Sequence, residues 1–95
     1  MLYEWDPNKN ASNIENHGLD FQDAGIVFQN PYVIFEDKRK EYGEARWILY
    51  GLLEDIVVNM VYTLRKDCIR IISMRKANKR ERAKYEKKIR ETTRK

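Results

Sequence analysis

The chain has 95 residues, of which 42% are hydrophobic and 36% are charged, and its formal net charge at pH 7 is +4. A chain of this length buries only about 60–65% of its unfolded surface, which excludes a separate cofactor-binding domain. The single cysteine, Cys68, excludes an internal disulfide and favours a reducing compartment. No apolar run approaches the roughly 20 residues of a membrane-spanning helix, and the N-terminus lacks the pattern of a signal peptide. We therefore expect residues 1–95 to be one cytoplasmic domain with no membrane contact.

Two helices are predicted in the first third of the chain. Residues 2–5 read as a short strand that stops at Asp6, a natural N-cap, and the proline after it suits a first helical turn. We expect a helix over residues 7–16, ended by Gly18. Asp20 caps a second helix, and an Asn-Pro pair ends it. The apolar stripe of this second helix is Phe21, Ala24, Val27 and Phe28.

From Tyr32 onward the apolar residues alternate, which is the period of a β-strand. Strands are predicted at residues 32–35, 46–52, 56–64 and 68–75, and a charged loop at residues 36–43 separates the first two. Short connections make these neighbours antiparallel. The predicted fold class is therefore α+β: two N-terminal helices packed on one face of an antiparallel meander sheet, followed by a basic C-terminal helix.

The last part of the chain is strongly basic. Residues 75–95 contain 11 Lys or Arg and 3 Asp or Glu, a net charge of +8, whereas residues 1–74 carry −4. We expect a helix over about residues 76–91 with a frayed end. Its row of Ala77, Glu81, Tyr85 and Ile89 is a weak anchor, so only its first turns should pack on the sheet. A lysine-rich helix is often only a solvated face with internal ion pairs. Because this helix follows a buried strand, its charge is fixed in place and suits a polyanion such as RNA.

Arginines near strand ends form the first candidate site. Ser73 and Arg75 share a face of the last strand, and Arg65, across the turn, points to the same side. We expect the two guanidiniums to cluster at one end of the sheet, where they would bind phosphate. Glu44 and Arg46 open the second long strand. They are either a surface ion pair or a carboxylate and a guanidinium held beside the other arginines.

His17, the only histidine, has two interpretations. Near a helix end a histidine commonly donates to a carbonyl or interacts with the helix dipole, and a catalytic role is less common. No second histidine, cysteine cluster or carboxylate pair with metal-ligand spacing accompanies it. The scattered glycines form no phosphate-binding loop, and no serine lies in a nucleophile-elbow sequence. The sequence therefore predicts no metal and no cofactor.

Short motifs follow one another in order along roughly residues 3–86. They are Glu4-Trp5-Asp6-Pro7-Asn8-Lys9, His17-Gly18, Gly43-Glu44-x-Arg46, Val58-x-x-Val61-Tyr62-Thr63-x-Arg65, Ile69-Arg70-Ile71-Ile72-Ser73-x-Arg75-Lys76-Ala77 and Arg80-Glu81-Arg82-x-x-Tyr85-Glu86. This combination resembles the BrnT toxin family. The resemblance implies the toxin of a type II toxin–antitoxin module, with a fold similar to that of RelE-like ribonucleases. It also implies a BrnA-like ribbon-helix-helix antitoxin, and contact with operator DNA only through that antitoxin.

The activity implied by the resemblance is cleavage of RNA, which arrests translation. Attack of a 2′-hydroxyl on the adjacent phosphate needs a base, an acid and cations that stabilise the extra phosphate charge. His17 and Glu44 are the candidate acid–base pair, with Tyr62 and Tyr85 as alternative proton donors. Arginines would supply the positive charge, so the reaction is expected to be metal-independent.

Two cations are expected to be catalytic, and others to hold the RNA. Arg65 and Arg75 should stabilise the charge on the phosphate, and their loss should abolish activity without unfolding the protein. Further RNA or phosphate contacts are assigned to Arg46, Ser73, Lys76, Lys79 and Arg80. Two rival functions use the same basic surface: a non-catalytic RNA- or ribosome-binding protein, and an interaction protein whose basic end binds an acidic partner.

Overall fold

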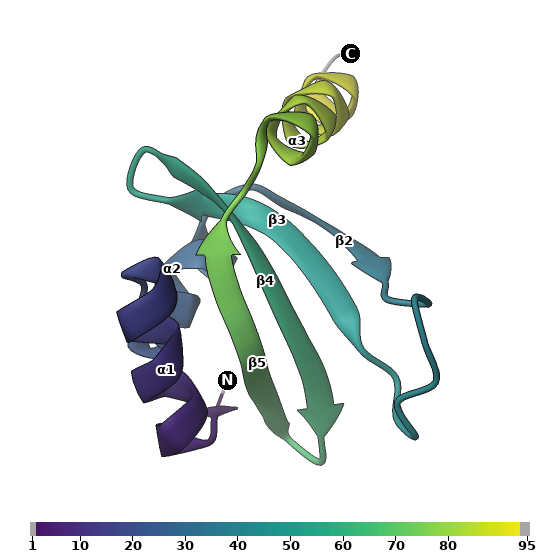
Figure 1. Ribbon diagram of the computed structural model, residues 1–95. Helices are drawn as coiled ribbons and strands as arrows, with labels where there is room; N and C mark the ends of the chain where they lie inside the picture. Colours follow the sequence, from purple (N-terminus) through teal and green to yellow (C-terminus); the bar gives the residue numbers. More distant parts are fainter. Residues whose placement is uncertain (1, 94–95) are drawn as a thin grey trace.

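A five-stranded sheet forms the centre of the molecule, and helices pack on both of its faces (Figure 1). The computed structural model describes residues 2–93. The elements within these residues are β1 (Leu2–Glu4), α1 (Pro7–His17), the 3-10 turn η1 (Phe21–Asp23), α2 (Ala24–Gln29), β2 (Tyr32–Glu36), β3 (Trp47–Leu53), β4 (Ile56–Arg65), β5 (Cys68–Lys76) and α3 (Lys79–Thr93). The strands lie in the order β1-β5-β4-β3-β2. The predicted α+β class is confirmed, but the predicted packing of both N-terminal helices on one face was wrong, because α2 packs on a face and α1 lies along the edge of β5.

The larger hydrophobic core lies between the sheet and α2, on what we call the α2 face. Its most deeply buried side chains are those of Phe21, Ala24, Val27, Leu49, Val58, Met60, Ile71 and Met74. The predicted second helix is divided in two, because Asp20 caps only the short η1 turn and α2 begins at Ala24. α2 approaches β3 so closely that a Cβ on Gly51 would lie 2.9 Å from Val27 Cγ1, so glycine is required there.

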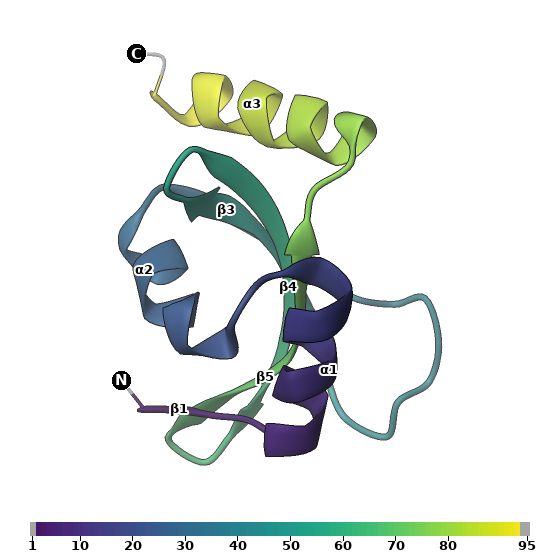
Figure 2. The same ribbon diagram turned by 60° about the vertical axis from the view of Figure 1, so that its left-hand side comes forward.

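The opposite face, which we call the α3 face, carries a second core. α3 lies across one end of the molecule (Figure 2) and packs Tyr85 and Ile89 against a cluster that includes Ile48 and Val61. The expectation that only the first turns of this helix touch the sheet was therefore wrong. Tyr85 is also fixed by a hydrogen bond from its hydroxyl to the carbonyl of Pro31, 2.9 Å away.

The boundaries of α3 also differ from the prediction. Residue Lys76 still belongs to β5, where it pairs with Val58, and the helix begins only at Lys79. The helix continues to Thr93 rather than fraying from residue 91. The rest of the predicted frayed end, residues 94–95, lies outside the described residues.

The sheet is mixed rather than purely antiparallel. β1 runs parallel to β5, with Glu4 opposite Arg70. The long connection that a parallel pair requires is supplied by α1 and the meander. Beyond β1, the edge of β5 is covered by α1. The side chain of Asn13 donates to Met74 O (2.7 Å) and accepts from Met74 N (3.2 Å), as a neighbouring strand would. This contact holds α1 against β5 and so positions the site described next.

Candidate active site

The β4–β5 hairpin decides where the predicted arginines lie. Arg65 pairs with Cys68 beside the turn, whereas Arg75 pairs with Asn59 at the far end. The stretch of β5 from Cys68 to Arg75 is about 23 Å long at the usual rise of a strand. The prediction that Arg65 and Arg75 cluster was therefore wrong. They share the α3 face but lie at opposite ends, because residues pair across a hairpin at matching distances from its turn.

Arg65 instead lines a small hollow near the hairpin turn. The hollow has a volume of about 110 Å³ and is lined by Asp6, Lys9, Glu44, Arg46, Arg65, Arg70, Ile71 and Ile72. Four of these side chains are cationic and two are anionic. The structure thus brings together three of the predicted site residues, Glu44, Arg46 and Arg65. It adds two that the sequence analysis missed, Lys9 and Arg70.

A wider hollow of about 370 Å³ adjoins the first along α1, and it too is lined by Lys9 and Ile72. We call the two hollows together the basic groove. His17 lines the wider hollow, about 12 Å along α1 from Lys9 at the rise of an α-helix. The predicted acid–base pair of His17 and Glu44 is therefore not brought together in one hollow. The His17 side chain is exposed and has no hydrogen-bond or ion-pair partner within residues 2–93, so the expected structural contact to a carbonyl is not made there.

Glu44 and Arg46 are carried by the β2–β3 loop, residues 37–46, which is organised around one buried carboxylate. The Asp37 side chain is completely buried and accepts hydrogen bonds from the Arg39 guanidinium and the Tyr42 hydroxyl. The hydrogen bonds from Arg39 hold the pKa of Asp37 well below its usual range. The ring of Tyr42 in turn lies 4.1 Å from the Arg46 guanidinium, a cation–π contact that supports Arg46 from behind.

The C-terminal end of the same loop is hydrogen-bonded to β4. The buried Thr63 hydroxyl donates to the carbonyl of Ala45, 2.6 Å away. Glu44 then lies between two guanidiniums, 3.3 Å from Arg65 Nη2 and 3.6 Å from Arg46 Nε. The second distance is too long for a hydrogen bond. Arg46 Nε is buried and has no hydrogen-bond partner in the described part of the chain, so this donor is available to an acceptor bound in the hollow.

The other charged residues of the small hollow differ in how many hydrogen bonds and ion pairs they already make within the protein. Arg70 Nη1 donates to Glu4 at 2.7 Å, because β1 places these residues opposite each other. Asp6 caps α1 by accepting from Asn8 N at 2.8 Å. Lys9 is exposed and makes no hydrogen bond or ion pair within the described residues. The lysine is therefore the least constrained cation at the junction of the two hollows.

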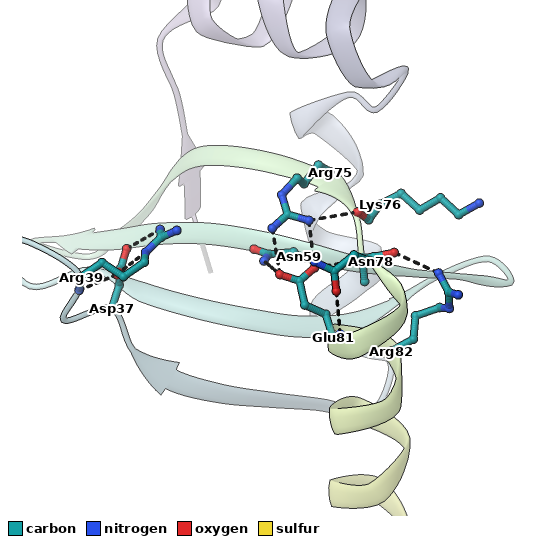
Figure 3. A network of polar contacts seen from close by, with 9 residues as sticks. Asp37, Arg39, Asn59, Arg75, Lys76, Asn78, Glu81 and Arg82 are labelled. Carbon is teal, nitrogen blue, oxygen red and sulfur yellow. Dashed lines mark hydrogen bonds and ion pairs between the residues drawn. The ribbon is translucent and has the colours of Figure 1, made fainter.

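Arg75 serves a different purpose at the other end of the face. It donates two hydrogen bonds of 2.8 Å to Glu81, which also accepts from Asn59 (Figure 3). Asn78 and Glu81 exchange backbone and side-chain hydrogen bonds in a capping box that starts α3. The hydrogen bonds from Arg75 lower the pKa of Glu81 to about 2. Arg75 therefore anchors α3 to the sheet and is not part of the basic groove.

The remaining predicted cations also lie at the α3 end. Lys76, Lys79 and Arg80 are exposed, and the Lys76 side chain points away from the Arg75 network (Figure 3). Ser73 pairs with Val61 between the two ends of the sheet and lines neither hollow of the groove. Of the predicted RNA-binding residues, Arg46 therefore lies in the basic groove. Ser73, Lys76, Lys79 and Arg80 lie outside it.

Neither alternative proton donor reaches the groove. Tyr62 is buried in the core of the α2 face, where its ring packs edge-on against Phe28 at 5.6 Å. Tyr85 is buried under α3 and donates to Pro31. Burial raises the pKa of both phenols.

A signal for one missed residue was present in the sequence. Arg70 lies between Ile69 and Ile71, which face the core, so strand alternation directs it to the other side. Lys9 had no such signal, since its place in the groove depends on how α1 lies against β5. Among residues 2–93, no three His, Cys, Asp or Glu side chains gather closely enough to hold a metal ion. No helix in this range is long and apolar enough to cross a membrane.

A family model described as the BrnT ribonuclease toxin of type II toxin–antitoxin systems matches residues 5–81. The chain belongs to the BrnT family. The matched residues include α1, the β2–β3 loop and the β4–β5 hairpin, which together line the basic groove. A comparison with curated protein sequences gave no match. As a BrnT protein, the chain is a ribonuclease toxin, with RNA as its substrate and an antitoxin as its partner.

Proposed function

We propose that this BrnT protein cleaves RNA in the basic groove, by attack of a 2′-hydroxyl on the adjacent phosphate and without a metal ion. The observation that carries the proposal is the convergence of Lys9, Arg46, Arg65 and Arg70 around Glu44 in a hollow of about 110 Å³. Four cations against two carboxylates leave the hollow net positive, which suits a phosphate that gains charge in the transition state, next to a carboxylate that accepts a proton.

We assign the catalytic role of each group from the hydrogen bonds and ion pairs that it already makes within the protein. Glu44 accepts the proton of the 2′-hydroxyl, the 2′-oxygen bonds to phosphorus, and the bond to the 5′-oxygen breaks. Arg46 and Arg65, which hold Glu44 loosely, donate to the phosphate oxygens, and the unpaired Arg46 Nε–H is satisfied by this contact. Lys9, the least constrained cation, protonates the leaving 5′-oxygen. His17 contacts the flanking nucleotide in the wider hollow.

The wider biological setting is also part of this proposal. The sheet and its helices would form a RelE-like fold, and the antitoxin would be BrnA-like, with a ribbon-helix-helix domain that alone contacts operator DNA. The exposed cations Lys76, Lys79 and Arg80 would guide RNA from the α3 end, which suits cleavage of cytoplasmic message and arrest of translation.

The test is cleavage of a single-stranded RNA by the purified protein in excess EDTA. We expect fragments with 2′,3′-cyclic phosphate and 5′-hydroxyl ends, and no cut at a position where the RNA carries a single 2′-deoxy sugar. The Arg65→Ala protein, purified identically, controls for contaminating nucleases. Intact RNA with and without ribosomes would support the non-catalytic rival, and loss of cleavage in EDTA would overturn metal independence.

A further inference from the structure

An apolar hollow lies on the α2 face, away from the basic groove. It has a volume of about 600 Å³, and Tyr3, Phe28, Tyr32, Ile34, Tyr62 and Leu64 contribute to its lining. Three of its lining residues are large apolar side chains that are exposed: Tyr32 at 40%, Ile34 at 40% and Leu64 at 59%. Soluble proteins seldom leave several large apolar side chains exposed beside one hollow unless a partner covers them.

The rim of this hollow includes the open edge of the sheet. β2 is the last strand in the order β1-β5-β4-β3-β2, and no other strand within residues 2–93 pairs with its outer side. Alternate residues of this five-residue strand therefore present unpaired backbone donors and acceptors, which can template another strand. The other edge is protected, because β1 is only three residues long and Asn13 satisfies the backbone of Met74 beyond it.

The opposite side of β2 is bordered by positive charge. α3 crosses β2 there, with Lys84 Nζ 4.1 Å from the centre of the Phe35 ring, and Lys88 follows one turn later. In the loop after β2, Lys38, Arg39 and Lys40 are exposed, but Glu36, Asp37 and Glu41 balance their charge, so the positive charge beside β2 comes from α3. The β2 edge thus has an apolar hollow on one face of the sheet and cations on the other.

We propose that β2 docks an extended segment of a partner protein, as a sixth strand, and that the segment alternates apolar and acidic residues. Successive side chains of a strand point to opposite faces. The apolar ones would enter the hollow beside Tyr32 and Ile34, and the acidic ones would meet the cations of α3. Backbone pairing gives affinity in this mode of recognition, and the alternate side chains give specificity. The antitoxin of the module is the partner that fits, and the inference does not depend on RNA cleavage.

A second copy of this chain is a poorer occupant of the same edge. Two β2 strands paired antiparallel about a two-fold axis would keep the same face of each sheet on one side. Both α3 helices would then lie on that side, and each belongs to a segment with a net charge of +8. Like charges brought together in this way oppose association.

The probe for this proposal is a fluorescein-labelled peptide of alternating valine and glutamate, and the readout is its fluorescence anisotropy with the full-length protein. We expect saturable binding that is at least tenfold weaker for a valine–lysine peptide. A valine–glutamate peptide with alternate N-methylated amides should also bind at least tenfold more weakly, since it loses backbone donors. Hydrogen exchange of the amides of residues 32–36 should slow when the unmodified peptide binds.

Two pairs of variants locate the binding site. Ile34→Lys should weaken binding at least tenfold, whereas Ile56→Lys, at a residue of similar exposure (37%) in the β3–β4 turn region, should not. Lys84→Glu with Lys88→Glu should weaken it, whereas Lys79→Glu with Arg80→Glu, at the other end of α3, should have little effect. The Ile34→Lys, Ile56→Lys and Lys84→Glu/Lys88→Glu proteins should retain wild-type RNA cleavage at saturating RNA, so failure here is distinct from failure of the catalytic proposal.

Three results would overturn the proposal. The first is no saturable binding of the valine–glutamate peptide, or equal binding of its N-methylated form. The second is binding that is indifferent to both the Ile34 and the α3 substitutions. The third is a concentration-dependent dimer in sedimentation that Ile34→Lys dissociates, which would assign the edge to a second copy of the chain.

Discussion

The two ends of the α3 face use the same residue types for different purposes. At the α3 end, Arg75 and Glu81 form a closed pair with two bonds of 2.8 Å, and Asn59 and Asn78 occupy the remaining acceptor positions of the carboxylate. At the turn end, Glu44 stands 3.3 Å and 3.6 Å from two guanidiniums that face a hollow. An arginine–carboxylate pair is therefore informative about function only through its geometry. A saturated pair stabilises the fold, and a loose pair beside a cavity has donors left for a substrate.

The sharpest test of this comparison replaces Arg65 and Arg75 by alanine, one at a time. Arg65→Ala should lower the rate of RNA cleavage about 100-fold or more, because it removes a charge contact made in the transition state. Its side chain is 52% exposed, so the free energy of unfolding should change by no more than about 0.5 kcal/mol.

Arg75→Ala should show the reverse pattern. It leaves Glu81 largely buried without its main partner, so the free energy of unfolding should fall by about 1–3 kcal/mol, while cleavage by the folded fraction stays within about threefold. This prediction differs from the sequence-based expectation that loss of Arg75 abolishes activity and leaves the fold intact. Single-turnover kinetics and urea denaturation of the two variants provide the measurements. Equal loss of rate in both variants would remove the distinction between the two ends.

A second prediction concerns the support of Arg46 by the loop. Tyr42→Leu removes the ring beneath the guanidinium and should lower kcat about tenfold, because small errors in the position of a catalytic cation are costly. Tyr42→Phe keeps the ring and should retain activity within about twofold. A purely structural role for Tyr42 would make both variants lose stability without this difference in kcat at saturating RNA.

A third prediction separates binding from catalysis. Replacing Lys76, Lys79 and Arg80 together by alanine should weaken RNA binding several-fold and reduce the slope of log affinity against log salt by about 2–3. The rate at saturating RNA should not change, since these residues lie outside the groove. A fall in that rate with no change in salt dependence would place the reaction at the α3 end instead.

The smallest effect is expected from pH. The pKa of Glu81 in the folded protein, about 2, lies below its ordinary 4.5, so the ion pair stabilises the fold fully above pH 4.5. This stabilisation is lost as the pH falls from 4.5 towards 2. Glu81→Gln should therefore lower Tm at pH 7 and flatten its dependence on pH in that window. Glu86→Gln, on the exposed side of α3, is the matched control and should follow the wild type.

Features that depend on neighbouring residues were predicted correctly from the sequence, whereas contacts between distant parts of the chain were not. The caps at Asp6 and Asp20 and the change of period after Pro31 located most elements within a few residues, since each depends on neighbours in the chain. The parallel partner of β1 and the position of α1 beside β5 depend on contacts such as Asn13 to Met74, 61 residues apart, which no periodicity encodes.

The composition of the site shows the same limit. Glu44, Arg46 and Arg65 were selected by residue type and strand position, and the structure brings them together. The position of Arg75 could have been predicted by counting residues from the β4–β5 turn, since this count places Arg75 at the opposite end of the hairpin from Arg65. Lys9 could not be found without the packing of α1, because a lysine in a first helical turn is otherwise an ordinary surface residue.

The pairing of β1 with β5 has a consequence for the synthesis of the toxin. Glu4 meets Arg70 across 66 residues, and the basic groove needs Lys9 from α1 beside Arg65 and Arg70 from the last hairpin. Contacts of such long range form late, because the intervening chain must first be present and ordered. Translation adds about 5–20 residues per second, so for several seconds a growing chain has α1 but no β5. During that time the nascent toxin has no complete groove, and the ribosome that makes it is not exposed to a finished ribonuclease until most of the chain has emerged.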